Sequence, residues 1–510
     1  MNASLKVFLN TISLYIKLVF TIVIGLYLTR IVLDHLGVED FGIYNLIGGV
    51  IAILSFLQTA LSISTQRYLS ISMGKKNDKE ITTVYSSSLA IHLVLSFGVL
   101  LAFELCSLFL FNDFLNIPKD RVWAAKIVFQ IMTFSTILTI LQVTYTAEIT
   151  AHEDLWLLAI IEIFSTLLKL CIIFIFDWST MDDLILYSSW MLITTFFSFS
   201  LKLIWSVNKY KECKIFHIGK YIEKNTIKKM LGFTGWNAFG TLALIGRNQG
   251  VAVLQNIFFG ATINAVYGIA NQVNSHLVYC SSIMTTSLTP QIMKSEGEGD
   301  RKRMLRLSIF ASKMAFFLSS FFALPLIIEI DTILSFWLKD VPEYTATYCI
   351  LILCMFIIMQ LYPGLTRAIQ AIGKIKNYQI ATSILLLLPI PIGYTMYKFG
   401  MHHTCVLFLM ILSQALQMVY AIWYLNQHTE FSLKHFYLFI AKALTIFLFI
   451  YIFGKYFHLL LLSHTSPFIT FLISCSCTLL LFTSIALTTI FDKQERESVF
   501  NLLKTLIKKH

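Results

Sequence analysis

Long apolar segments alternate with short polar segments along the whole chain. Runs of about 18 or more nearly uncharged residues recur from end to end, and each is long enough to cross about 30 Å of hydrocarbon as a helix. Because lipid offers the backbone no hydrogen-bond partners, a spanning segment must be a helix or part of a closed barrel. The runs are continuous and lack the period-two alternation of barrel strands. The pattern therefore predicts an all-α polytopic membrane protein.

The runs predict about fourteen transmembrane helices. Charged residues, prolines and glycines mark the breaks, and every connection is short. The predicted spans are residues 7–33, 41–66, 84–111, 122–147, 155–176, 184–207, 231–258, 264–289, 305–328, 345–368, 378–397, 404–426, 437–458 and 467–491.

Composition excludes a large soluble domain. Hydrophobic residues make up 57% of the 510 residues and charged residues only 13%, whereas soluble domains carry about 25% charged residues. Mean hydropathy is +0.74. Most of the nine cysteines lie in apolar runs and none forms a CxxC pair, so we expect no disulfide, metal site or cofactor. The first run lacks a small-x-small cleavage site and should remain as a membrane helix.

Lysine and arginine are concentrated in alternate loops. One set of loops and the termini hold about 26 basic residues, against about five in the other set. Those five are Lys119, Arg121, Lys339, Lys398 and Lys455. Basic loops stay in the cytoplasm, so both termini should be cytoplasmic and the helix count even. The net charge of +11 then reflects topology and contact with membrane lipids, and no nucleic-acid partner is expected.

The two halves of the sequence resemble each other. Similar residues recur at an offset of about 223 positions. The matched pairs are Gly37 and Gly260, Tyr44 and Tyr267, Ser64 and Ser287, and Gly74 and Gly297. Because an even number of helices separates the two copies, they should be parallel repeats related by an axis along the membrane normal.

The repeat predicts five parts of the chain. Residues 1–207 form an N-terminal six-helix lobe, and residues 208–230 form a basic cytoplasmic linker. Residues 231–426 form a C-terminal six-helix lobe, residues 427–491 add two helices, and residues 492–510 form a cytoplasmic tail.

Two hairpins carry a resemblance to a known family. The segment Arg30 to Tyr44 (RIVLDHLGVEDFGIY), followed by Thr65 to Leu69 (TQRYL), is similar to the N-terminal motif of polysaccharide-biosynthesis flippases. The segment Phe259 to Gln272, with its YGIA core, is similar to the second-lobe motif. The chain thus resembles Wzx-type O-antigen flippases of the multidrug/oligosaccharidyl-lipid/polysaccharide (MOP) exporter superfamily.

This resemblance implies a MATE-like fold and a function. Such proteins move an undecaprenyl-diphosphate-linked oligosaccharide from the cytoplasmic to the periplasmic leaflet of the bacterial inner membrane, by alternating access between lobes. Surface polysaccharides such as O-antigen, capsule or exopolysaccharide are built from these units. The implied partners are the lipid-linked substrate, an H⁺ or Na⁺ coupling ion and polysaccharide-assembly proteins.

Arg247 is the leading candidate for substrate binding. It lies near the middle of the seventh predicted span, where an ionised group is costly unless it faces a cavity or a partner. Gly240, Ala243 and Gly250 share its face and should leave room for a ligand group. A guanidinium can bind phosphate oxygens bidentately; the alternative is a buried arginine paired with a carboxylate or with helix-end carbonyls. The adjoining polar stripe includes Asn237, Thr241, Asn248 and Gln255.

Three further cations lie within predicted spans. Lys17 and Arg30 are in the first span, and Lys313 is in the ninth. Lys17 and Arg30 are close enough to the span ends to snorkel to the interface, but the resemblance favours a cavity-lining role for Arg30. Lys313 either lines a cavity or contacts a neighbouring helix.

Intramembrane carboxylates are candidates for ion coupling. Glu162 and Lys169 lie two turns apart on one face of the fifth span, as a structural ion pair or part of a proton or sodium relay, and Glu104 lies in the third span. Asn271 and Gln58 either join helices or hydrogen-bond sugar hydroxyls.

Two other functions remain open. An ion-coupled multidrug antiporter of the same superfamily should use acidic cavity residues, whereas this chain has a cationic centre. An integral-membrane polysaccharide polymerase or transferase should show a long outer loop or a constellation of acidic and histidine side chains. Asp182 and Asp183 form an acidic pair in a very short predicted outer loop, and the sequence places no base beside them. We therefore expect a transporter without catalytic residues.

Overall fold

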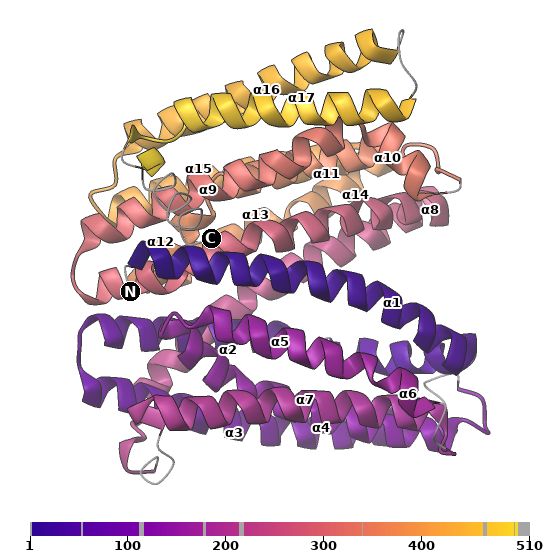
Figure 1. Cartoon of the computed structure of the whole chain (residues 1–510), viewed down its shortest axis with the longest axis vertical. Helices are drawn as coiled ribbons and strands as arrows, with labels where there is room; N and C mark the ends of the chain where they lie inside the picture. The colour runs from indigo at the N-terminus through magenta and orange to yellow at the C-terminus, as the bar shows by residue number, and fades with distance from the viewer. Residues whose placement is uncertain are drawn as a thin grey trace, which may run out of the picture. The chain divides into compact units, whose positions relative to one another are not determined.

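The structure is a computed structural model that describes residues 3–52, 55–111, 117–176, 180–213, 219–338, 340–462, 467–493 and 495–497. Within these residues the regular secondary structure is entirely helical (Figure 1), as the pattern of apolar runs predicts. Lys339 and most of the predicted tail 492–510 lie outside the described residues.

The chain divides into two compact units. One comprises Lys6–Ala238 and is called here the N-terminal unit; the other comprises Phe239–His510 together with Met1–Leu5 and is called the C-terminal unit. The N-terminal unit contains α1 (Ala3–Ala52), α2 (Ser55–Gly74), α3 (Asp78–Phe109), α4 (Val122–Ala151), α5 (Leu155–Leu170), α6 (Ile172–Phe176), α7 (Asp183–Lys209) and the short 3₁₀ helix η2 (Lys211–Cys213). Helix α8 (Lys224–Gly297) begins in this unit and continues in the next.

The remaining helices belong to the C-terminal unit. They are α9 (Arg301–Ile328), α10 (Ile330–Trp337), α11 (Thr345–Gln360), α12 (Pro363–Ile372), α13 (Lys376–Leu387), α14 (Pro389–Lys398), α15 (Cys405–His428), α16 (Leu433–Leu462) and α17 (Pro467–Thr489). Figure 1 shows α16 and α17 running side by side, and both pack against α9.

Each unit has an apolar core built by one central helix. In the N-terminal unit α4 packs against α2, α3 and α7, and Val128 and Phe129 of α4 are completely buried in its core. In the C-terminal unit α15 packs against α11, α13 and α14, with Val406 of α15 and Tyr348 of α11 in its core. Because association in lipid depends on such close packing, these helices hold the polar side chains described below in place.

The helix count agrees with the fourteen spans expected from sequence. Eleven of the described helical segments are long and apolar enough to cross a membrane. One of them, α8, holds two crossings because Gly260 breaks it. One further span consists of the helix after Gly37 together with α2, and another consists of the pair α11 and α12. Helices α11 and α12 are bent by 43°, where Pro363 has no N–H to continue the helix.

The repeat seen in the sequence is also visible in the backbone. Gly37 (φ 69°, ψ 175°) and Gly260 (φ 78°, ψ −172°) break α1 and α8 at matched positions. Asn77 caps α3 by accepting a hydrogen bond from the Glu80 N–H, and Asp300 caps α9 through the Arg303 N–H. Both pairs are 223 positions apart. The two halves of the chain therefore build the same helix-break-helix-cap arrangement.

Candidate functional site

Three lysines from three helices surround one carboxylate in the N-terminal unit. Lys17 of α1 forms an ion pair with Glu162 of α5. Lys169 of α5 and Lys202 of α7 also interact electrostatically with Glu162. Lys202 is buried and donates to Gln142 Oε1 at 3.2 Å, about 10 Å along α7 from its end. This lysine cluster therefore carries more positive than negative charge inside a segment that can span a membrane.

The partner of Glu162 differs from the simplest sequence expectation. Glu162 and Lys169 were expected to pair along one face of α5, but the direct ion pair is to Lys17. Two helical turns separate Glu162 from Lys169, about 10 Å along the axis, so a side chain from an adjacent helix comes closer. Lys202 is not among the candidate residues drawn from the sequence. Its position within the apolar run 184–207 could have marked it as an intramembrane cation.

Arg247 is buried in the C-terminal unit without an acidic partner among the described residues. Its side chain is 4% exposed, and Nε and Nη2 donate to Asn248 Oδ1 at 3.2 and 3.1 Å. Nη1 has no hydrogen-bond partner there. Tyr267 and Tyr362 lie near the guanidinium. A buried cation with an unsatisfied donor is expensive unless an anion binds it, at least transiently.

The glycines beside Arg247 have a packing role. A Cβ at Gly240 would collide with the end of the Gln379 side chain, and a Cβ at Gly250 would collide with Ile390. The space expected to hold a ligand group at these two positions is thus filled by α13 and α14.

The predicted polar stripe has several different environments. Asn237 and Gln255 are buried, and the Asn237 amide donates to the Phe233 carbonyl one turn earlier. Asn248 accepts from Arg247. Asn271 donates to the Tyr267 carbonyl in its own helix. The amide groups of Asn237, Asn248 and Asn271 thus have hydrogen-bond partners within α8. The charge of Arg247 has no acidic partner among the described residues.

A cavity of about 290 Å³ with both polar and apolar lining lies in the N-terminal unit. Gln58 of α2 lines it, as do Tyr44 of α1, Ser135 and Thr139 of α4 and Ser188 of α7. Ser188 donates to the Leu184 carbonyl and Thr139 to the Ser135 carbonyl, in both cases in their own helices. Hydroxyl groups bound in this way still have free acceptor capacity, so the cavity suits a neutral ligand rich in hydroxyls.

The other candidates lie elsewhere. Arg30 is exposed on α1. Lys313 forms ion pairs with Glu495 at 2.8 Å and Asp492 at 3.4 Å, which corresponds to the helix-contact alternative for this residue. Glu104 accepts a hydrogen bond from Gln130 at 3.2 Å.

The acidic pair Asp182 and Asp183 at the start of α7 has a basic partner that the sequence did not reveal. Arg121, before α4, forms ion pairs with both Asp40 and Asp182, the latter at 2.6 Å. Burial disfavours the charge of Asp182, but hydrogen bonds from Arg121 outweigh this and lower the pKa of the carboxyl group. The three residues come from segments 81 and 61 positions apart, so only the fold brings them together.

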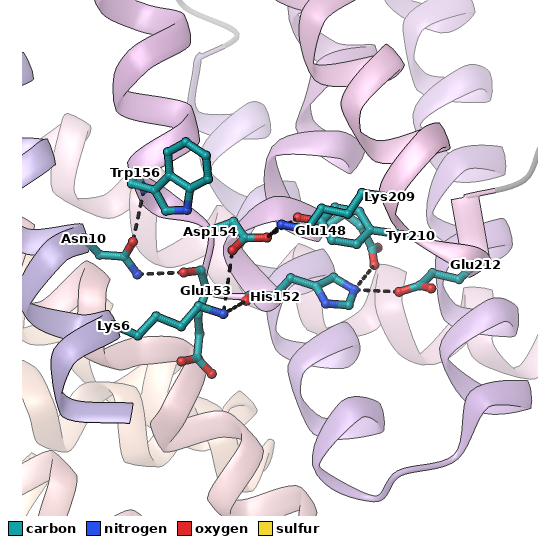
Figure 2. A network of polar contacts seen from close by, with 10 residues as sticks. All are labelled: Lys6, Asn10, Glu148, His152, Glu153, Asp154, Trp156, Lys209, Tyr210 and Glu212. Atoms are coloured by element: carbon teal, nitrogen blue, oxygen red, sulfur yellow. Dashed lines mark hydrogen bonds and ion pairs between the residues drawn. The ribbon is translucent and has the colours of Figure 1, made fainter. Parts of the chain in front are cut away.

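A second mixed cluster lies where α4 ends (Figure 2). It contains Glu148, His152 and Glu212. Burial opposes protonation of the imidazole, but the neighbouring carboxylates of Glu148 and Glu212 favour its charged form and raise the pKa of His152 to about 9. Burial likewise opposes the charge of Glu212, while hydrogen bonding to His152 lowers its pKa to about 2. No metal site was expected from the sequence, and no local motif joins these residues, because Glu212 is 60 positions from His152.

Comparison with known proteins identifies the fold. No protein-family model and no curated protein sequence matches the chain. Among solved structures, an outward-facing multidrug resistance MATE family transporter of the MOP superfamily is 13% identical, with a TM-score of 0.72, over 84% of this chain and 96% of that one. The chain has a MATE-like fold. A MATE structure in the straight conformation is similar too, at 12% identity and a TM-score of 0.71, over 84% of this chain and 96% of that one.

One MATE-like neighbour is described by the polarity of its pocket. It is a MOP superfamily transporter from Pyrococcus furiosus in which "reverse polarity of binding pocket suggests different function". It is 13% identical, with a TM-score of 0.68, and the match covers 84% of this chain and 96% of that one. The fold alone therefore does not assign the polarity of a binding pocket in this chain.

Proposed function

We propose that this protein is a flippase for a lipid-linked oligosaccharide in a bacterial inner membrane. The substrate would be an undecaprenyl-diphosphate-linked repeat unit that moves from the cytoplasmic to the periplasmic leaflet during surface polysaccharide synthesis. The MATE-like fold supports transport, and the resemblance of the two hairpins to Wzx-type proteins supports this substrate.

The observation that carries the proposal is the sign of the intramembrane charge. Lys17, Lys169 and Lys202 surround the single carboxylate of Glu162, and Arg247 has no acidic partner among the described residues. A buried cation without an acidic partner in a spanning helix, such as Arg247, is costly and usually serves a function. A diphosphate carries the charge that would neutralise such a cation, and the Arg247 guanidinium offers the planar donors that bind phosphate oxygens well.

The sugar part of the substrate has a matching environment. The cavity lined by Gln58, Tyr44 and Ser188 has amide and hydroxyl groups in its wall and no charged side chain among its lining residues. Amide and hydroxyl groups both donate and accept hydrogen bonds, which suits neutral sugar hydroxyls.

A multidrug antiporter is the second candidate, because one structural neighbour is described as a multidrug resistance transporter. An exporter of cationic drugs needs negative charge to bind them. Glu104 is the most suitable carboxylate, since its described contacts include a neutral amide and no cation. Glu104 would then be essential for drug export, whereas the flippase proposal makes Arg247 and Lys202 essential.

The test replaces each cation and follows surface polysaccharide and its precursor. In R247A and K202A cells we expect loss of surface polysaccharide with accumulation of the lipid-linked precursor. The conservative variant R247K should retain part of the activity, because it keeps the charge and loses the bidentate geometry. K75A, which removes an exposed surface cation, is the matched control.

A binding measurement separates loss of function from misfolding. Purified wild-type protein should bind a short isoprenyl diphosphate and fail to bind the corresponding isoprenyl alcohol, and R247A should bind neither. Normal polysaccharide export by R247A and K202A at wild-type protein levels would overturn the proposal. Drug resistance that depends on Glu104 with unchanged polysaccharide would support the antiporter in its place.

A further inference from the structure

Glu148, His152 and Glu212 converge on one point at the end of α4 (Figure 2). Glu148 and His152 are one helical turn apart, and Glu212 comes from η2, the first structured segment after α7. His152 Nε2 is 3.3 Å from Glu148 Oε1 and 2.7 Å from Glu212 Oε1. The three ligand atoms all lie within 4.8 Å of one another. One nitrogen and two carboxylate oxygens thus face the same small volume.

The buried carboxylate of Glu148 points to a missing ligand. Its side chain is 0% exposed, and neither oxygen has a hydrogen-bond partner among the described residues, although Oε1 is within ion-pair distance of His152. A buried carboxylate normally has several strong donors or a metal ion. His152 lies within ion-pair distance of both Glu148 and Glu212.

The surrounding residues hold the imidazole in a fixed position. The Tyr210 ring stacks on the His152 ring, with centroids 4.0 Å apart and planes 5° apart. Lys6 donates to the His152 carbonyl at 2.6 Å. Asp154 receives hydrogen bonds from Lys209 and from the Tyr210 hydroxyl, each at 2.7 Å. Ligands that are held in place in this way bind a metal ion more tightly, because their side chains lose little conformational freedom when the ion binds.

Charge also favours a divalent cation. Two carboxylates and a neutral imidazole carry a charge of −2, which a divalent ion would balance in this largely buried place. The nearby ammonium groups of Lys6 and Lys209 are bound to Asp154. The N–O separation of 3.3 Å matches two ligands that are each about 2.1 Å from a tetrahedral metal ion.

We propose that Glu148, His152 and Glu212 bind one divalent transition-metal ion of the zinc type. Imidazole and carboxylate are ordinary zinc ligands. Because Glu148 is on α4, His152 directly follows α4 and Glu212 is on η2, the metal would fix η2 against the end of α4. This inference is independent of the proposed flippase function.

The Arg121 cluster provides an internal contrast. It also places one basic side chain between two carboxylates, Asp40 and Asp182. A guanidinium keeps its protons, so it cannot act as a metal ligand. An imidazole can lose one proton and bind a metal through the nitrogen that becomes free. The two clusters are therefore electrostatically similar but differ in the capacity to bind metal.

The test measures metal bound to the full chain, purified in detergent with an affinity tag that contains no histidine. After chelator treatment and titration with Zn²⁺, we expect about one tight site per chain. Binding should release the Nε2 proton, so the measured heat should depend on the ionisation enthalpy of the buffer. Zn²⁺ should also slow tryptic cleavage after Lys211, the residue next to the ligand Glu212 in η2.

Variants distinguish a metal site from an electrostatic contact. H152A and E212Q should each lower Zn²⁺ affinity by at least about 10-fold, a loss known even for groups that only support metal ligands. E212H is the decisive variant, because it removes the carboxylate but supplies another zinc ligand; it should retain Zn²⁺ binding and protection from trypsin. E80Q, which changes an exposed carboxylate paired with Lys75, is the matched control and should bind as the wild type does.

The outcomes are separable even if one variant folds poorly. Glu212 lies in the short η2 segment outside the long helices, so its variants should elute from size exclusion as the wild type does. Wild-type protein that binds no more Zn²⁺ than H152A would overturn the proposal. Loss of Zn²⁺ binding in well-folded E212H together with unchanged binding in E212Q would overturn it as well.

Discussion

Gly37 and Gly260 have nearly the same backbone conformation although 223 residues separate them. Both have positive φ and ψ near 180°, a region that is almost restricted to glycine. Each interrupts a long apolar helix so that the chain leaves one span and enters the next. The repeated sequence thus encodes a repeated break in the backbone.

Substitution of either glycine should destabilise the protein. G37A and G260A should each cost about 1–3 kcal/mol, the usual cost of a residue in a sparsely populated backbone region. The cause is conformational, since no atom lies within 4 Å of a Cβ at either position. Thermal unfolding of the purified protein in detergent measures the loss. Gly268 is helical and equally uncrowded, so G268A should unfold at or above the wild-type temperature, and an equal loss in all three variants would contradict this explanation.

A buried contact should make Gly364 sensitive for a different reason. Its N–H donates to Ser312 Oγ at 3.1 Å, and a Cβ there would collide with the Ser308 backbone carbonyl of α9. Backbone atoms cannot rotate away as the end of a side chain can, so G364A should lower the free energy of unfolding by about 1–3 kcal/mol. G240A is the comparison, since the added methyl meets only the flexible end of Gln379. Unfolding temperatures should rank wild type, G240A and G364A in descending order.

The ion pair between Lys17 and Glu162 should be visible in a double-mutant cycle. K17Q and E162Q each remove one member of this ion pair, so the two losses of stability should add up to more than the loss in the double variant. We expect a coupling energy of about 0.5–3 kcal/mol. Thermal unfolding of the four proteins at one salt concentration provides the measurement. Strictly additive effects would mean that the pair makes no net contribution.

Acid should weaken the Arg121 cluster. The pKa of Asp182 is lowered in the folded protein, so its contribution to stability is complete above the ordinary carboxyl pKa of about 3.9. This contribution is lost as the pH falls from there through the lower pKa of the folded state. D182N should therefore be less stable than wild type at pH 7, and the difference should shrink below about pH 4.

The control for the pH experiment is a carboxylate in an exposed pair. E80Q changes a side chain that is 35% exposed and should shift the unfolding curve little at any pH. A D182N curve that runs parallel to the wild-type curve from pH 7 to pH 3 would show that Asp182 is not the titrating group.

The sequence alone determined the helices and their repetition. Apolar runs of membrane-spanning length leave the backbone few options in lipid, so the all-helical fold and the approximate spans followed directly. Gly37 and Gly260 could also be found, because a special backbone conformation restricts residue type locally. Arg247 was recognisable as a candidate because an isolated charge in an apolar run is costly wherever its helix packs.

The tertiary structure decided which side chains meet. Glu162 was expected beside Lys169, yet its direct partner is Lys17 of another helix, and Gly240 and Gly250 proved to accommodate α13 and α14 rather than a ligand. Glu148, His152 and Glu212 showed no motif, because Glu212 is 60 residues from His152. Helical periodicity fixes the face of one helix, whereas contacts between helices depend on packing and rotation that no local pattern encodes.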